Sequence, residues 1–210
     1  MEKLLDEIES YWSTRTEGYS EVNHKELAGT QKNAWLKVLT SQFPDKPKEE
    51  IRILDIGTGP GFFPVILAEA GYHVDAVDYT EGMLEKAKEN AGELCRNIHF
   101  QRMDAQKLEF EDNTFDVVIS RNLTWNLEHP DVAYREWVRV LKVGGKLLNF
   151  DANWYGYLYW ITAVSSDFPS APASRRERTG RKGAGSEWRR TAQCRRCGGL
   201  APSAFRYTAR

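Results

Sequence analysis

Residues 51–61 read IRILDIGTGPG, and residues 62–70 continue as FFPVILAEA. A short apolar run ends in a glycine-rich turn, and an apolar helical pattern begins directly after it. Glycine lets the backbone turn tightly and brings its N–H groups close to a ligand without a clashing Cβ atom. A strand, a glycine-rich turn and a helix in this order predict a ligand-binding loop of the nucleotide type.

The spacing of the glycines separates this turn from two other glycine-rich loops. A dinucleotide fingerprint, G-x-G-x-x-G, would need its third glycine at position 62, where the chain has Phe62. A phosphate loop would close with Lys-Ser or Lys-Thr, and neither follows the turn. The pattern present is D-x-G-x-G-x-G, made by Asp55, Gly57, Gly59 and Gly61, with Thr58 between the first two glycines.

Two further acids stand at the ends of predicted strands. The second strand is expected at 73–78 and ends on Asp78, 17 residues after the glycine turn, and Asp104 follows a third strand at 97–103. The carboxyl ends of parallel strands share one edge of a sheet, so both acids are expected beside the turn. An acid placed like Asp78 can accept hydrogen bonds from both hydroxyls of a ribose. The alternative is that Asp78 only caps the next helix, although Thr80 is the expected N-cap.

The rest of the chain continues the alternation of strands and helices. A nearly continuous apolar fourth strand is expected at 115–120, and a fifth at 146–150. Between them we expect a helix that has Asp131 as its N-cap and ends at the glycine pair 144–145. The pattern predicts an α/β fold with a doubly wound, mostly parallel, Rossmann-like sheet and helices on both faces.

The glycine turn, the two acids and one later segment together resemble a known family. Residues 136–146 read EWVRVLKVGGK, which resembles the helix-to-strand signature of the class I S-adenosylmethionine (SAM)-dependent methyltransferases, with Val143 in place of the usual proline. From residue 51 to about residue 157 the chain is similar to the type 11, UbiE-like members. The family's sheet has seven strands and the sequence predicts five, so the last two strands are expected to be missing.

The resemblance implies SAM as the cofactor and a set of residues that hold it. Asp104 and Ala105 stand where the family reads adenine: the acid accepts from the exocyclic amine, and a backbone N–H donates to a ring nitrogen. Met83 stands where the family packs a side chain on the adenine face, and a plain core role is equally open. Asn122 belongs to the loop expected above the reactive end of the cofactor, and Tyr19 stands where a tyrosine approaches the carboxylate of SAM. The full predicted set is Asp55, Gly57, Thr58, Gly59, Gly61, Asp78, Tyr79, Met83, Asp104, Ala105, Asn122 and Tyr19.

The activity that the resemblance implies is transfer of a methyl group from SAM to a small-molecule acceptor by in-line displacement. Because the sulfonium methyl is already activated, alignment of the two reactants is the main task and no catalytic base is obligatory. His129 and His24 are the histidines that could serve as a base, and a structural role is favoured for a lone histidine. Two alternatives stay open: a non-catalytic SAM-binding module, and an NAD(P)-binding oxidoreductase, against which the misplaced third glycine argues.

Residues 1–50 are predicted to be helical to about residue 43 and then to connect to the first strand. Apolar residues recur on two helical stripes, which a turn-favouring segment at 12–19 separates. This part of the chain either covers the sheet, or it is a lid whose Trp12, Arg15 and Tyr19 close over a ligand. The sequence favours the cover.

Composition separates a SAM-binding domain at 51–160 from a tail at 161–210. The chain of 210 residues has a net charge of −1, yet residues 165–210 carry 11 basic residues against 3 acidic ones. Apolar periodicity is lost there, so disorder is expected, and the abrupt change favours the hypothesis of an out-of-frame or otherwise aberrant tail. The fifth strand would then be an exposed edge of the sheet.

Partners and compartment are predicted from what the sequence lacks. No apolar run is long enough to span a membrane, and the charged N-terminal segment does not resemble a signal peptide. Three cysteines are too few and too unevenly spaced for a disulfide framework, which favours a cytoplasmic location. Cys194 and Cys197 have no second pair of zinc ligands, and the basic tail contains no recognised nucleic-acid-binding module, so neither a metal nor a nucleic-acid partner is expected.

Overall fold

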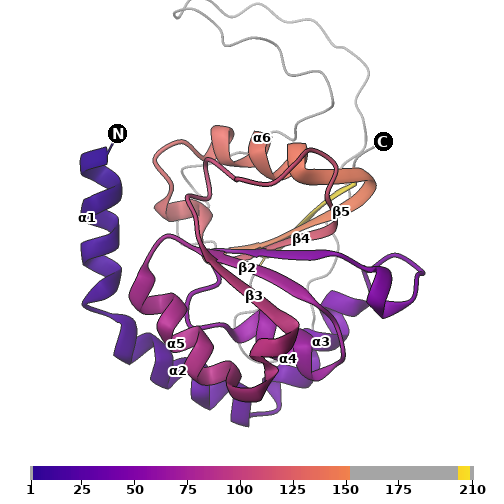
Figure 1. Cartoon of the computed structure of the whole chain (residues 1–210), viewed down its shortest axis with the longest axis horizontal. Coiled ribbons are helices and arrows are strands. Elements are labelled where there is room, and N and C mark those ends of the chain that lie inside the picture. Colours follow the sequence, from indigo (N-terminus) through magenta and orange to yellow (C-terminus); the bar gives the residue numbers. More distant parts are fainter. Residues whose placement is uncertain (1, 152–202, 209–210) are drawn as a thin grey trace, which may run out of the picture. The chain divides into compact units, whose positions relative to one another are not determined.

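The computed structural model of the chain describes residues 2–151 and 203–208 (Figure 1). Its α-helices are α1 (Glu2–Ser13), α2 (Thr16–Ala28), α3 (Gln31–Thr40), α4 (Phe62–Glu69), α5 (Glu81–Ala91) and α6 (Pro130–Val140). Its strands are β1 (Ile53–Ile56), β2 (Val74–Asp78), β3 (Ile98–Arg102), β4 (Phe115–Arg121), β5 (Leu141–Asp151) and β6 (Ser203–Thr208). Three short 3-10 helices are η1 (Lys48–Glu50), η2 (Gly92–Asn97) and η3 (Thr124–Asn126).

The strands form one sheet in the order β3-β2-β1-β4-β5-β6. The first five strands are parallel, which confirms the predicted doubly wound class. After β3 the chain crosses back past β2 and β1 to β4, so the strand order reverses between β1 and β4. In open α/β sheets, ligands bind outside the carboxyl ends of the strands at such a reversal. The glycine turn after β1 and the loop after β4 both border it.

Helices cover both faces of the sheet: α6 lies on one face, and α2 to α5 lie on the other (Figure 1). The alternation of side chains along β1 accounts for the two cores. Ile53 joins a buried cluster with residues of α3 and α4, whereas Leu54 and Ile56 join one with residues of α6. Each face of this central strand is therefore buried, as expected for a parallel strand that helices cover on both sides.

The N-terminal helices attach to the face that carries α4, and they do so in two ways. α3 buries Leu39 completely and places Trp35 edge-on against Phe63 and Phe150, with ring centroids 5.3 and 5.1 Å apart. α1 and α2 are attached by ion pairs, which are Glu9–Arg102, Glu17–Lys86 and Glu26–Arg121. α3 is thus an apolar cover on the sheet, whereas α1 and α2 add ion pairs, and α2 also packs Leu27 against the buried clusters.

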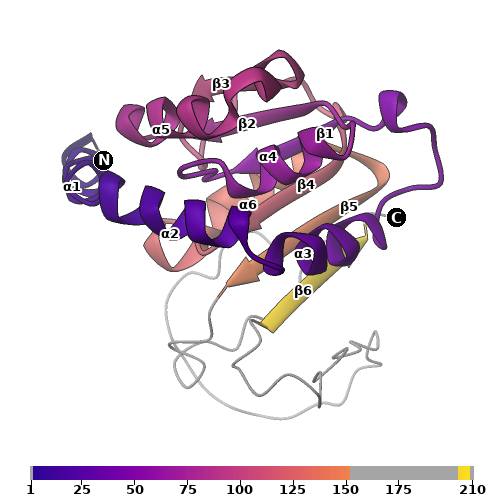
Figure 2. The same cartoon turned by 90° about the horizontal axis from the view of Figure 1, so that it is seen from below.

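Two expectations for the C-terminal part are wrong. β6 pairs antiparallel with β5, so the sheet has a sixth strand that was not predicted, and β5 is not an exposed edge (Figure 2). Disorder was expected for the whole tail, and for 203–208 this expectation fails. These residues read SAFRYT, a short alternation whose aromatic residues favour a strand, but an arginine-rich surrounding hid the signal. The remaining tail, with Cys194 and Cys197, lies outside the described residues.

The bounds of α6 also differ from those predicted. The helix begins at Pro130 with His129 as its N-cap, instead of with Asp131 as the cap, because the fixed φ of proline suits the first helical turn. It ends at Val140, and the next residue already pairs in β5. The glycine pair therefore lies inside a strand, at a register shift, with Gly144 at a φ of 80°.

Candidate functional site

The glycine turn ties the end of β1 to the end of β2. The N–H groups of Gly57 and Thr58 both donate to the carbonyl oxygen of Val77, at 2.8 and 3.0 Å. Gly57, Gly59 and Gly61 have φ values of 67°, 52° and 88°. Side chains rarely adopt this left-handed region, so the three glycines are required by the backbone path of the turn.

The three glycines differ in what surrounds them. A Cβ atom on Gly57 would lie 2.8 Å from the side chain of Leu123, and one on Gly61 would lie 3.0 Å from Ala87. A Cβ atom on Gly59 would meet no atom within 4 Å among the described residues. The outer glycines thus permit close packing, while Gly59 borders open space that a ligand can fill.

Asp78 closes the turn with its carboxylate. Oδ2 accepts a hydrogen bond from the N–H of Gly59 at 2.8 Å, and Oδ1 accepts one from the N–H of Thr80 at 2.9 Å. Burial raises the pKa of Asp78, and these two N–H groups oppose the rise. A carboxylate has about four acceptor positions, so about two remain for a ligand. Asp78 therefore contacts the cap of α5 and the glycine turn at once, and its role towards a ribose stays a prediction.

Asp55 is the most deeply buried acid of the predicted set. It has the same strand parity as Ile53 and therefore points to the α4 face of the sheet. Its exposed fraction is 2%. Burial, with a smaller contribution from the charge of Asp78, raises the pKa of Asp55 to about 7, while Thr58 and Arg121 oppose the rise. A cationic ligand group nearby would favour the ionised form of Asp55.

Asp104 lies beside Asp78, because the N–H of Met103 donates to the Asp78 carbonyl oxygen at 3.0 Å. Asp104 Oδ1 accepts from the N–H of Gln106 at 2.8 Å, which fixes the turn locally. Neither Asp104 Oδ2 nor the N–H of Ala105 makes a hydrogen bond within the part of the chain that the structure describes. One free acceptor and one free donor therefore stand side by side at the end of β3.

Two tyrosines belong to the predicted set: Tyr19 lies in α2, and Tyr79 lies in the link between β2 and α5. Tyr19, in α2, is 43% exposed and meets the ring of Trp12 edge-on at 5.0 Å. Partial burial raises the pKa of Tyr19, and the neighbouring Tyr11 adds to the rise. Tyr79 follows Asp78, and its ring lies 4.8 Å from the Arg102 guanidinium.

Met83 and Asn122 complete the predicted set. Met83 is 3% exposed within α5, which fits either a core side chain or one that meets a ligand, so its role stays a prediction. Asn122 is exposed and has a φ of 56°, and its N–H donates to the Phe150 carbonyl oxygen at 2.9 Å. Asn122 thus fixes the path of the loop after β4.

Arg121, at the end of β4, was not predicted as a site residue. Its guanidinium donates two hydrogen bonds to Glu26 of α2, at 2.7 and 3.0 Å. It also lies within 5.7 Å of the ring centroids of Trp35, Phe62 and Phe63. Arg121 therefore joins α2 to the tip of β4. Glu26 stands 95 positions away in the sequence, so no local pattern could have indicated this pair.

The buried face of α2 is polar, which the sequence analysis also missed. Thr16, Ser20 and Asn23 follow helical spacing and are 7%, 4% and 4% exposed. The Thr16 hydroxyl donates to the Trp12 carbonyl oxygen at 3.1 Å, whereas Asn23 Oδ1 has no partner among the described residues. Buried polar atoms are normally paired, so Asn23 Oδ1 is a candidate ligand contact, as are other unpaired buried side-chain atoms of the described residues. The helical spacing of these three residues is present in the sequence, but polar residues at that spacing do not by themselves indicate a buried face.

A groove of about 360 Å³ lies between α1 and the loop after β4. It is lined by Glu7, Ile8, Tyr11, Trp125 and Asn126. The ring of Trp12 lies 6.0 Å from that of Trp125 and links the groove to Tyr19. The groove therefore combines aromatic surface with one carboxylate.

A small polar cluster lies at the end of β5, near the same loop. The Thr124 hydroxyl and the Asn149 amide both donate to Asp151, and the amide also donates to the Tyr134 hydroxyl at 2.8 Å. Burial raises the pKa of Asp151 and, with Asp151 nearby, raises that of Tyr134 to about 12. At neutral pH, Tyr134 is therefore a neutral hydrogen-bonding group.

The two candidate bases lie elsewhere. His129 is the last residue of the loop after β4, at the start of α6, and its backbone N–H donates to the Gln106 side chain at 2.7 Å, beside the Asp104 turn. His24 is an exposed residue of α2. Neither is brought to the end of β4.

A doubly wound sheet with a glycine turn beside its reversal point, and acids at the ends of the next two strands, is typical of a nucleotide-type binding domain. Residues 54–149 match the model of a methyltransferase domain. A ubiquinone biosynthesis O-methyltransferase of Coxiella burnetii is 30% identical over 139 residues, which cover 65% of this chain and 58% of that protein. A demethylmenaquinone methyltransferase of Clavibacter sepedonicus is 39% identical over 97 residues, which cover 46% of this chain and 39% of that protein. A solved SAM-dependent methyltransferase of Methanococcus maripaludis, described as putative, has a TM-score of 0.60 at 24% identity, with 67% of this chain and 64% of that one covered.

The methyltransferase-domain match and the named relatives confirm the resemblance to the class I SAM-dependent methyltransferases seen in the sequence. The cofactor that these comparisons support is SAM. The chain spans about half the length of the curated relatives it matches. Within the described residues, no helix is long and apolar enough to cross a membrane, and no group of three or more His, Cys, Asp or Glu could hold a metal ion.

The residues present fit a SAM-like ligand. Gly59 borders open space, and Asp78 retains acceptor capacity for two hydroxyls. Asp104 Oδ2 and the Ala105 N–H match one donor and one acceptor of adenine, and Asn23 Oδ1 matches a donor such as an ammonium. The ribose, the adenine and the ammonium of SAM thus each have a candidate partner among these residues.

Alanine substitution at two glycines tests whether the turn borders the ligand. Gly59 and Gly71 both have a positive φ, 52° and 88°, and a Cβ atom on either would meet nothing within 4 Å. Both Gly59→Ala and Gly71→Ala should lower the free energy of unfolding by about 1 kcal/mol through backbone strain. Only Gly59→Ala should weaken binding of S-adenosylhomocysteine, the demethylated product of SAM, by about tenfold in calorimetric titration, because one added methyl group fills contact space. Equal binding by the two variants would contradict this placement of the ligand.

Proposed function

We propose that this protein is a SAM-dependent methyltransferase that acts on a small-molecule acceptor. One observation carries the proposal: hydrogen bonds join the glycine turn, Asp78 and the Asp104 turn along the carboxyl ends of β1, β2 and β3, next to the point where the strand order reverses. This brings a ribose-type acceptor pair and an adenine-type donor and acceptor to one edge. The match to the family model supports the same reading.

Each end of the cofactor is assigned to residues of its own. Asp78 holds the ribose hydroxyls, and Asp104 with the Ala105 N–H reads adenine. Met83 packs on the adenine face, and Tyr79 borders the ribose site. Gly57, Gly59 and Gly61, with Thr58, line the amino-acid end, where Asp55 and Asn23 face the ammonium. Tyr19 and Asn122 close this end from α2 and from the loop after β4.

The chemistry needs few protein groups. Bound SAM supplies a methyl group that is already activated by the sulfonium. The protein residues hold the acceptor in line with that methyl and exclude water, and such alignment alone can be worth roughly 7–11 kcal/mol. No general base is assigned, since neither His129 nor His24 lies at the end of β4.

The acceptor is proposed to be an aromatic small molecule. The groove between α1 and the loop after β4 offers Tyr11 and Trp125, with Trp12 and Tyr19 adjoining, and planar ligands stack well on such rings. The relatives named for ubiquinone and demethylmenaquinone methylation support this class. Thr124, Asn149 and Tyr134 could orient a polar substituent of the ring. A cytoplasmic location, inferred from cysteine usage, is part of the same proposal.

Calorimetric titration of a variant in which Asp78, at the end of β2, is replaced by asparagine tests the assignment of the cofactor site. In Asp78→Asn the amide NH₂ would face the N–H of either Gly59 or Thr80, and the ribose would lose a charged acceptor. Binding of SAM and of S-adenosylhomocysteine should weaken by about 10- to 100-fold. Asp75→Asn, at the other end of β2, is the matched control and should bind as wild type. If Asp78→Asn binds SAM as tightly as the control does, the assignment is wrong.

The same protein distinguishes the remaining functions. Transfer of a tritiated methyl group from SAM to a panel of phenols, quinols and amines would establish the activity. SAM binding without transfer to any acceptor would favour the non-catalytic module. Fluorescence changes on titration with NADH, in the absence of SAM binding, would instead favour the oxidoreductase.

The pKa of Asp55 predicts how SAM binding depends on pH. SAM carries a net positive charge, so it favours ionised Asp55, and protonation below about pH 7 should weaken binding. The affinity of wild type should rise about tenfold from pH 5.5 to 7.5, and Asp55→Asn should show a flatter profile in the same titrations. The stability of the ligand-free protein depends on pH in the opposite direction. Because the pKa of Asp55 is higher in the folded protein than in the unfolded chain, its contribution to stability is fully present below the pKa of the unfolded chain. That contribution is lost as the pH rises through about 7. Identical profiles for wild type and Asp55→Asn would remove Asp55 from the site.

A further inference from the structure

Residues 103–114 connect β3 to β4 without a helix or a strand of their own. Loops of this length within a domain are uncommon and usually have a function. This one begins with the Asp104 turn, which carries the free acceptor and donor described above. It runs along the face of the sheet where α6 is the covering helix (Figure 1). Its conformation therefore depends on the side-chain contacts that α6 makes with it.

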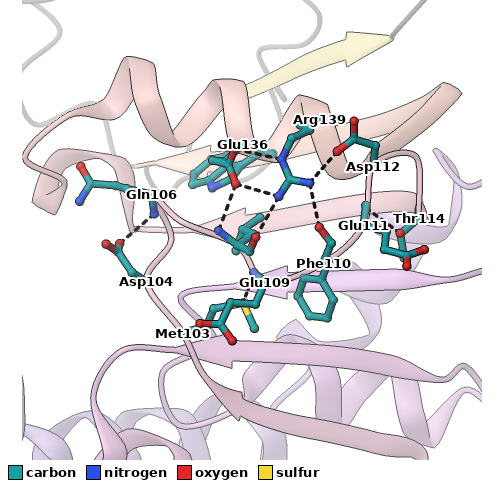
Figure 3. A network of polar contacts seen from close by, with 12 residues as sticks. Met103, Asp104, Gln106, Glu109, Phe110, Glu111, Asp112, Thr114, Glu136 and Arg139 are labelled. Carbon is teal, nitrogen blue, oxygen red and sulfur yellow. Dashed lines mark hydrogen bonds and ion pairs between the residues drawn. The ribbon is translucent and has the colours of Figure 1, made fainter.

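Arg139 of α6 uses its whole guanidinium on this loop and its surroundings (Figure 3). Nη2 donates to the Leu108 carbonyl oxygen at 2.9 Å, and Nη1 donates to that of Phe110 at 2.8 Å and to Asp112 Oδ1 at 2.7 Å. Nη2 and Nε also donate to the two carboxylate oxygens of Glu136, at 2.8 and 3.0 Å. All five N–H donors of the guanidinium are thus engaged, a fork that a lysine cannot reproduce.

Two neighbours of Arg139 extend the same contact. Glu136 Oε2 accepts from the N–H of Leu108 at 3.2 Å, so the Leu108 peptide is held from both sides. Trp137 is fully buried, and its indole N–H donates to the Ala105 carbonyl oxygen at 2.8 Å. One turn of α6 therefore fixes both the middle of the loop and the residue whose own N–H is free at the site.

We propose that Trp137 and Arg139 are positioning residues that give the site its preference for adenine over other purines. The inference rests on the proposed function, because it takes Asp104 and Ala105 as the adenine contacts. Reading one donor and one acceptor together needs the turn to be placed within about 0.5 Å. The indole N–H holds the carbonyl oxygen of Ala105, the residue whose N–H is free. The Arg139 guanidinium prevents the loop from moving as a whole.

A purine with a 6-oxo group separates this role from a general loss of stability. Hypoxanthine cannot donate to Asp104 from position 6, and its N1–H would face the Ala105 N–H. It therefore gains little from a well-placed turn. A looser turn should weaken binding of the adenine ligand and leave that of the 6-oxo ligand nearly unchanged. Simple destabilisation would weaken both alike.

The test compares the dissociation constants of S-adenosylhomocysteine and S-inosylhomocysteine by calorimetry, in the full chain. Trp137→Phe keeps an aromatic ring and removes the N–H, and Arg139→Lys keeps the charge and removes the fork. Each should reduce the preference for the adenine ligand by about fivefold, the effect of about one hydrogen bond. Arg135→Lys is the matched control: it makes the same exchange on the same helix, where the arginine pairs with exposed Asp131, and it should keep the wild-type preference.

The outcomes separate the two levels of the argument. If wild type binds neither ligand, the proposed function fails. If wild type prefers the adenine ligand and both variants keep that preference, the positioning role is wrong while the proposed function stands. Should Trp137→Phe fail to fold, Arg139→Lys decides, since this side chain is partly exposed. Loss of folding in Arg139→Lys would also overturn the inference, because the contact would then serve the fold itself.

Discussion

The hydrogen bonds between the glycine turn and the end of β2 are the constraint on which the rest of the site depends. Three consecutive interactions, from Gly57 and Thr58 to Val77 and from Gly59 to Asp78, join two parallel strands at their carboxyl ends. They fix where the turn places its N–H groups, and they orient the Asp78 carboxylate. The positive φ angles of the turn make this path accessible to glycine and strained for other residues.

The two faces of the sheet support this edge in different ways. On one face, α4 and α5 begin at the turn and just after Asp78, and α2 adds a polar stripe whose end is tied to β4 by Glu26 and Arg121. On the other face, α6 packs on the sheet through a fully buried tryptophan and holds the loop from β3 to β4 by side-chain hydrogen bonds. Polar contacts with long sequence separation thus position the site, while the apolar cores position the strands.

The sequence was sufficient where local spacing carries the information. The order of β1, turn and α4, the acids after β2 and β3, and the parallel class all follow from short patterns within one βα unit or the next. It was insufficient where a residue's partner is distant. Arg121 meets Glu26 across 95 positions, and the strand at 203–208 finds its place only by pairing with β5. The buried face of α2 was not predicted for another reason: its residues are polar, whereas a buried helix face is normally recognised by apolar residues.

The early start of β5 shows how tertiary pairing overrides a local stop signal. Gly144 and Gly145 read as the end of a helix, yet Leu141 already pairs with Phe115, and the extra residues are absorbed by a register shift. Gly144 adopts a φ of 80° inside the strand. The same glycines that mark a helix end in one context therefore permit a bulge in another.

The central claim is that one ligand spans the glycine turn, Asp78 and the Asp104 turn. Amide hydrogen exchange of the full chain, measured with and without saturating S-adenosylhomocysteine, tests it most directly. The account predicts slower exchange together in residues 57–61, 78–80 and 104–106 when the ligand is bound. Protection that misses these three segments, or no protection at all at saturating ligand, would contradict it.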